Sequence, residues 1–229
     1  VPMQIGVPRN LFFTGTVNVD ETTYMFSPKV LDRAFVLEFN DVDLEGLATP
    51  AGDDVGEDTG GLRLIHFEGA LDIREKASRE DYQQVSLLAG RAVHRALSSL
   101  NARLSAEHRH FGYRVANEIA RFIGLAVAQA GRDPEVVWEA LDVAILAKIL
   151  PKIHGTQQEV EDALARLLAF AVDVDSDVMT REAEASWAFA GSQIRAKEGD
   201  RVPRLPRSAA KLWRMLRRAR LQGYVSFIE

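Results

Sequence analysis

Residues 133–151 read DPEVVWEALDVAILAKILP, and they show most clearly that the chain is built from helices. Asp133 and Pro134 are residue types that begin a helix, and Pro151 is one that ends it. Between them, apolar residues recur every three or four positions, which is the spacing of one helix face: Val137, Leu141, Ile145 and Ile149. The stretch therefore predicts a helix with one buried side.

Similar apolar spacing continues on both sides of this stretch. It predicts four further helices, over 85–104, 115–131, 160–171 and 208–221. Residues 182–195 form a fifth candidate with weaker periodicity, and the apolar residues at 224–228 predict a short strand near the end of the chain. We find no internal repeat, so we expect a largely helical structure.

The first 45 residues contain the strongest β signals. Residues 10–17 form a nearly continuous apolar run after turn residues, as in a strand buried on both faces of a parallel sheet. A short helix is expected over 29–34 and a second strand over 35–39. Residues 45–61 are rich in Gly, Asp, Glu and Thr and predict a solvated loop. Their carboxylates lack the spacing of a calcium loop, so no metal site is predicted.

Composition excludes several classes of protein. The 229 residues include no cysteine and carry a formal net charge of -5. A disulfide scaffold, a thiolate zinc site and a cysteine nucleophile are therefore excluded. No apolar run approaches the roughly 18 residues of a membrane span, and no signal region is visible, so we expect a cytoplasmic protein without a membrane partner. Because the sequence begins with Val1, we expect it to be a fragment.

Three polar residues near the first strand are candidates for chemistry. Asn18 directly follows the strand, where open α/β sheets bind ligands, although it could equally stabilise a turn. Glu21 lies in an acidic pair that could serve as acid or base, or simply be solvated. Arg33 ends a short helix and could stabilise phosphoryl charge, or pair with Asp32 or Glu38.

Residues 15–23, GTVNVDETT, and 27–34, SPKVLDRA, resemble the second half of the AAA+ core in the McrB-like family, the NTPase subunits of modification-dependent restriction systems. The resemblance implies that Asn18 is the sensor 1 residue, which orients the attacking water. It also implies that Arg33 is the arginine finger, which faces the nucleotide of a neighbouring subunit. Glu21 stands where McrB carries Asp, so the role of this acid and the choice between ATP and GTP stay open.

The resemblance continues into the helical part. Residues 111–114, FGYR, look like the sensor 2 region of an AAA+ lid, so Arg114 would touch phosphates of its own subunit; an exposed arginine at a helix start is the alternative. The implied fold class is mainly α with a small α/β part. The expected parts are distal AAA+ core strands in 1–45, an acidic connector in 46–77, a helical lid in 78–172 and a helical extension in 173–229.

The sequence contains neither a Walker A loop nor a Walker B strand. The resemblance therefore implies a C-terminal remnant of an AAA+ core that binds no nucleotide and hydrolyses none by itself. In the intact protein it implies ATP or GTP hydrolysis with Mg²⁺ in a ring oligomer, expected to be a hexamer. Hydrolysis would drive DNA restriction or translocation, with a nuclease subunit as a further partner.

The segment from Arg201 to Arg220 holds eight basic residues and no acidic one. Four of them are candidates for contact with DNA phosphates or with an acidic partner: Arg207, Lys211, Arg214 and Arg218. A solvated basic helix face is the alternative. The second hypothesis for function is therefore a non-enzymatic helical interaction or DNA-binding module that acts through this helix.

Overall fold

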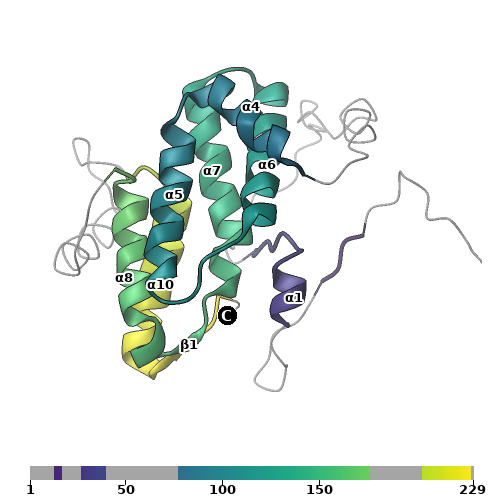
Figure 1. The fold of residues 1–229 in the computed structure, drawn as a ribbon. Helices are drawn as coiled ribbons and strands as arrows, with labels where there is room; N and C mark the ends of the chain where they lie inside the picture. Colours follow the sequence, from purple (N-terminus) through teal and green to yellow (C-terminus); the bar gives the residue numbers. More distant parts are fainter. Residues whose placement is uncertain (1–12, 17–26, 40–76, 176–202, 228–229) are drawn as a thin grey trace, which may run out of the picture. The chain divides into compact units, whose positions relative to one another are not determined.

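The computed structural model describes residues 13–16, 27–39, 77–175 and 203–227 (Figure 1). The chain divides into two compact units, and the described helices and strands all lie in the unit formed by Glu21–Leu37 and Ala77–Glu229. Within the described residues the fold is mainly helical, as predicted. The elements are α1 (Pro28–Leu31), α4 (Arg79–Ala89), α5 (Ala92–Ser105), α6 (Tyr113–Ala130), α7 (Pro134–Lys148), the 3₁₀ turn η1 (Leu150–Lys152), β1 (Gly155–Thr156), α8 (Gln157–Val172), α10 (Pro206–Gln222) and β2 (Tyr224–Val225).

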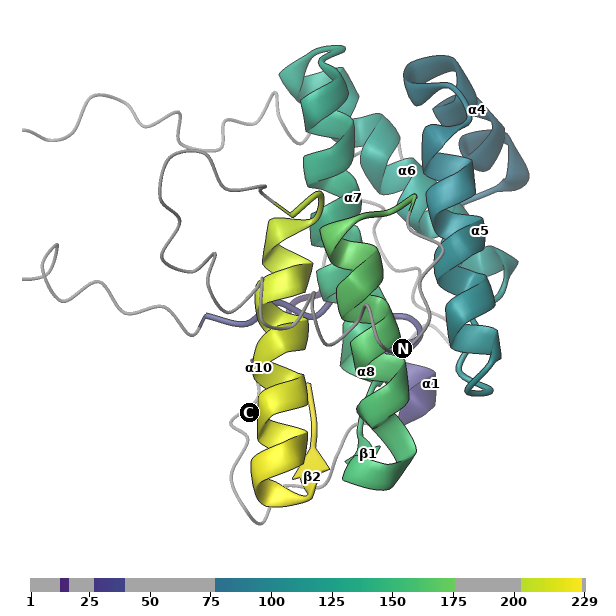
Figure 2. The ribbon, with the colours of Figure 1, turned by 90° about the vertical axis from the view of Figure 1, so that its left-hand side faces the viewer.

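Helix α7 lies at the centre of this unit and packs against α4, α6 and α10 (Figures 1 and 2). Its N-cap Asp133 accepts a hydrogen bond from the Glu135 amide, as the sequence predicts. The predicted apolar stripe is buried, but so are the alanines on its other faces: Ala140, Ala144 and Ala147. Because three helices surround α7, small residues on these faces let the neighbouring helices approach closely.

The helix predicted over 85–104 is wrong as a single element, because it is divided between α4 and α5. The division falls at Gly90, whose φ of 60° lies in the region that favours glycine and ends the helical path. The apolar positions on both sides of the break, Val85 and Leu100 among them, are nevertheless buried in the common core. The apolar spacing thus identified the buried residues but not the turn between the helices.

Helices α8 and α10 lie side by side and are joined at one end by a small sheet (Figure 2). Strands β1 and β2 pair antiparallel, with Gly155 opposite Val225 and Thr156 opposite Tyr224. The predicted terminal strand is thus present, although it is limited to Tyr224–Val225 within the described residues. Helix α10 also confirms the amphipathic helix predicted over 208–221.

The N-terminal expectations are corrected where the structure describes them. Residues 35–39 form no strand, and α1 ends at Leu31 rather than at residue 34. Residues 13–16, the described part of the first predicted strand, are also irregular and exposed. The remainder of that strand, the acidic loop at 45–61 and the candidate helix at 182–195 lie outside the described residues. The apolar side chain of Phe35 packs against a helix residue, Phe122, instead of entering a sheet.

Candidate functional site

Two of the predicted nucleotide-site residues, Asn18 and Glu21, lie outside the described residues. Arg33 is described: it follows α1 in a turn and its side chain is exposed. The alternative partner considered for it, Asp32, is instead engaged by two cations of the helical unit. Lys152 donates to Asp32 Oδ1 at 2.6 Å, and Arg114 forms an ion pair with Asp32 Oδ2. Two ion pairs with the helical unit therefore hold in place Asp32, the residue directly before Arg33.

Arg114 lies in the first turn of α6, at the helix start that the sequence predicts. A cation there faces the positive end of the helix dipole, so it is stabilised by acidic partners rather than by the helix itself. Besides Asp32, its Nε lies 3.9 Å from Glu118 Oε1, one helical turn further on. The side chain is 46% exposed, so it remains accessible from solvent. Contact between Arg114 and a nucleotide phosphate stays a prediction.

Lys148, in the last turn of α7, is the buried centre of the same charge network. Its side chain is 0% exposed, and its Nζ lies 2.5 Å from Glu118 Oε2. The ammonium also lies 4.9 Å from the centre of the Phe35 ring. Burial lowers the pKa of Lys148, and the Glu118 carboxylate partly offsets this by favouring the charged form. Burial likewise lowers the pKa of the neighbouring Lys152.

The backbone after Arg33 is bound to the end of α7. Lys148 Nζ donates to the carbonyl of Ala34 at 3.3 Å, and the Val36 amide donates to the carbonyl of Ala147 at 2.9 Å. The last carbonyls of a helix lack partners within the helix, so Ala147 offers a free acceptor. Phe35 adds a ring contact with Phe122 at 5.6 Å between centroids. We call residues 32–36 with Arg114, Glu118, Lys148 and Lys152 the docking cluster.

The basic side chains of α10 do not all lie on an exposed face, in contrast to the sequence-based expectation. Lys211 is buried at 1% exposure with its ammonium 4.5 Å from the Phe227 ring centre, so its assignment as a DNA contact is corrected. Arg207 pairs with Glu139 of α7 at 3.3 Å, and Arg218 Nε donates to Gln222 Oε1 at 2.7 Å. Arg214 is exposed. Much of the basic charge of α10 is therefore used for contacts within the unit.

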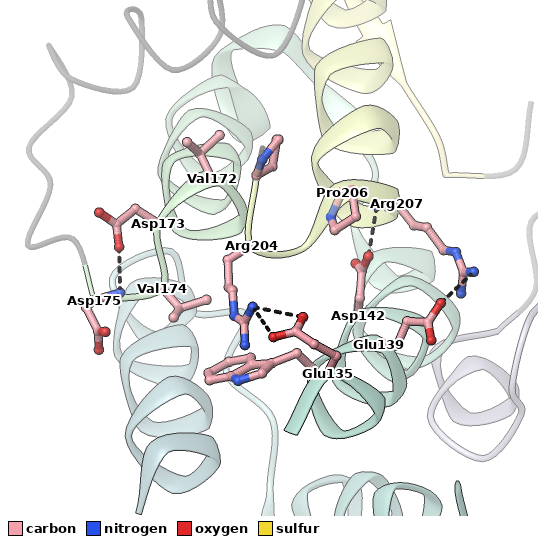
Figure 3. A pocket seen from close by; sticks show the side chains of 12 residues that line it. Glu135, Glu139, Asp142, Val172, Asp173, Val174, Asp175, Arg204, Pro206 and Arg207 are labelled. Carbon is pink, nitrogen blue, oxygen red and sulfur yellow. Dashed lines mark hydrogen bonds and ion pairs between the residues drawn. The ribbon is translucent and has the colours of Figure 1, made fainter. Parts of the chain in front are cut away.

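A cleft of about 670 Å³ lies where α7, the end of α8 and the start of α10 meet (Figure 3). Its most buried polar group is Asp142, which is 1% exposed. The two carboxylate oxygens of Asp142 accept the amides of Arg207 and Ser208 at 2.8 and 2.9 Å, so α7 caps the start of α10. Burial raises the pKa of Asp142, and the hydrogen bonds from Ser208 and Arg207 partly offset this rise.

Both arginines that line the cleft have acidic partners on α7. Arg204 forms two hydrogen bonds of 3.1 Å with Glu135, and its guanidinium lies 4.4 Å from the Trp138 ring centre. Figure 3 shows Arg207 turned toward Glu139 on the other side of the helix start. Both arginines are thus already paired with acids of the same unit. We therefore interpret the contacts around this cleft as joining α7 to α10, and not as a binding site for an anion.

Sequence reasoning missed the two charged residues that α7 buries, Asp142 and Lys148. The signal was present, because both interrupt an otherwise apolar run between Ala140 and Leu150. Charged residues are seldom fully buried unless they are paired. Their partners, however, lie far away in the sequence: Asp142 is 66 positions from Ser208, and Lys148 is 114 positions from Ala34. The order of residues in the sequence does not by itself show that these positions are in contact.

No group of three or more histidine and acidic side chains among the described residues is arranged to hold a metal ion. In the same part of the chain, none of the helices has the length and apolar character needed to cross a bilayer.

Comparison with known proteins gives one result. Residues 73–224 match the model of a family described as a domain of unknown function, DUF8727. A search of curated proteins and a search of solved structures each found no match. The matched range includes all the described elements from α4 to α10, and it covers more than half of the chain. The chain therefore belongs to the DUF8727 family.

Proposed function

We propose that the chain is the C-terminal part of a McrB-like AAA+ NTPase, in which the described helices form the lid and its extension. The observation that supports this best is the position of Asp32. It directly precedes Arg33, the predicted arginine finger, and it pairs with Arg114, the predicted sensor 2 residue. The two arginines to which the resemblance assigns phosphate contacts, one at the neighbouring subunit's nucleotide and one at its own, thus lie close together on either side of Asp32.

In the proposed reaction, ATP or GTP is hydrolysed at the boundary between two subunits of a cytoplasmic ring. Negative charge on the transferring phosphoryl group is stabilised by cations that are already held in position. Arg33 supplies such a cation to the nucleotide of the neighbouring subunit, and Arg114 supplies one to the nucleotide of its own. Asn18 orients the attacking water, with Glu21 beside it. Hydrolysis then drives DNA restriction or translocation.

The charges of the described residues suit a ligand that carries phosphate. Three basic side chains with access to solvent gather at or beside the docking cluster, Arg33, Arg114 and Lys152, and the acids of the cluster are Asp32 and Glu118. Basic side chains therefore outnumber acids at this place, whereas acids outnumber basic residues in the whole chain. The sequence holds no Walker A or Walker B segment. In the proposed NTPase, the phosphate loop and the Mg²⁺ ligands are therefore supplied by a part of the natural protein outside this sequence.

The test replaces Arg33 by alanine in the natural full-length protein. Loss of an arginine finger lowers NTP turnover by about 10³-fold or more, so Arg33→Ala should lose turnover while nucleotide still binds. Arg132→Ala, an exposed arginine after α6, is the matched control and should retain turnover. Wild-type turnover by Arg33→Ala would refute the proposal.

The same experiment separates this proposal from the helical DNA-binding alternative. That alternative predicts no NTP turnover even in the wild-type protein, together with DNA binding that weakens with salt. Such binding should then be lost on replacing the exposed α10 arginines, Arg214 and Arg217. Loss of turnover in Arg33→Ala, without an effect of the α10 replacements, favours the NTPase.

A further inference from the structure

Both neighbours of Arg33 in the chain are held by lysines from the end of α7 and the turn after it. On one side, Lys152 binds the Asp32 carboxylate at 2.6 Å. On the other side, Lys148 binds the Ala34 carbonyl at 3.3 Å. The Arg33 side chain itself is exposed between these two fixed points. The helical unit therefore fixes the backbone that carries Arg33 and leaves the guanidinium free to meet another molecule.

Lys148 is the more informative of the two lysines, because its charge is fully buried. Removing an ammonium from water costs several kcal/mol, and one ion pair seldom recovers the whole cost. A methionine at this position would fill the same space without that cost. The retained charge has two uses that methionine lacks, the ion pair with Glu118 and the hydrogen bond to Ala34.

We propose that Lys148 is the positioning residue of Arg33. This inference rests on the proposed function. It assigns a role in the proposed reaction to a buried residue that contacts neither the nucleotide nor the attacking water. Lys148 binds the main chain directly after Arg33, while the Val36 amide attaches the next residues to Ala147. Together these contacts fix where the Arg33 guanidinium projects, so that a neighbouring subunit meets it in one place.

The first test measures docking without any reference to catalysis. The Val36 amide should exchange slowly with solvent because it donates to Ala147 at 2.9 Å. In Lys148→Met, NMR-detected exchange at Val36 should accelerate by about tenfold or more, since local opening is set by the contacts that oppose it. Lys211→Met is the matched control, because Lys211 is also a buried lysine beside an aromatic ring. It should leave Val36 exchange unchanged.

A second variant covers the case in which Lys148→Met fails to fold. Replacing Lys148 and Glu118 together by methionine removes both charges of the ion pair, and such replacements are often tolerated. The double variant should keep its helical circular dichroism and still show fast exchange at Val36. Slow exchange at Val36 in a folded variant, single or double, would overturn the positioning role.

The last readout is turnover by the full-length protein. Misplacement of a catalytic group by about 1 Å can cost roughly 10²-fold in rate. Lys148→Met should therefore lower kcat by about 10- to 100-fold and leave the KM for the nucleotide unchanged. If Arg33→Ala loses turnover but Lys148→Met keeps it, the positioning role is wrong and the NTPase assignment stands. If Arg33→Ala keeps turnover, the NTPase assignment fails first, and the positioning of a catalytic arginine fails with it.

Discussion

Replacing Asp142 by alanine should destabilise the helical unit by about 2 to 4 kcal/mol. Asp142 accepts the Arg207 and Ser208 amides at 2.8 and 2.9 Å, at a site where Ser208 is fully buried. Alanine leaves both amides without an acceptor, and each such group costs about 1–3 kcal/mol. The loss is reduced because alanine also removes a buried carboxylate, whose raised pKa reports an unfavourable charge.

Urea unfolding followed by circular dichroism at 222 nm measures this loss. A lower midpoint with an unchanged slope is expected, because the variant changes stability rather than the surface exposed on unfolding. Asp133→Ala is the matched control: Asp133 caps α7 through Glu135, but it is exposed. An exposed cap typically contributes about 1 kcal/mol. If Asp142→Ala costs no more than Asp133→Ala, the claim that α7 fixes the start of α10 is wrong.

Two further predictions concern stability. Burial alone would raise the pKa of Asp81, but hydrogen bonds from Arg121 and from a backbone amide outweigh it and hold the pKa below the ordinary value of an aspartate. The stability that Asp81 supplies is therefore present above the ordinary aspartate pKa and is lost as the pH falls through the lowered pKa, so the deficit of Asp81→Asn measured by urea unfolding should shrink in acid; a deficit that is constant with pH would contradict this. Gly155 has a φ of 149°, and an added Cβ would lie 2.9 Å from Glu159 Oε2, so Gly155→Ala should lower the melting temperature through a strain of about 1–3 kcal/mol. Gly124→Ala, within α6 and with open space around it, should raise the melting temperature slightly, and equal shifts for both variants would refute the strain.

The sequence could predict those parts of the fold that depend on local spacing and caps. Asp133 and Pro134 predict the start of α7, and the amphipathic pattern predicts α10; the structure confirms both helices. The apolar run at 35–39 was misleading, because an irregular segment that packs on a helix needs the same apolar side chains as a buried strand. The local pattern predicts that Phe35 contacts an apolar surface, but it does not predict whether that surface belongs to a sheet or to a helix.

The docking cluster could be predicted only in part. Arg33 and Arg114 were identified through the family resemblance, and the position of Arg114 at a helix start is confirmed. Their connection could not be predicted, because it runs through the ion pair between Asp32 and Arg114, which lie far apart in the sequence. Long-range pairing depends on how α6 and α7 pack, and no spacing along the chain encodes that directly.

Mixing subunits of the full-length protein tests most directly whether Arg33 acts across a subunit boundary. Arg33→Ala subunits are combined with Arg114→Ala subunits, which lack the predicted sensor 2 arginine of their own site but keep Arg33, and turnover is measured at constant total protein. Where an Arg33→Ala subunit receives Arg33 from an Arg114→Ala neighbour, its nucleotide site contains both arginines. We therefore predict that the mixture hydrolyses nucleotide faster than either variant alone. Turnover of the mixture that does not exceed the average of the two variants would contradict the proposed role of Arg33.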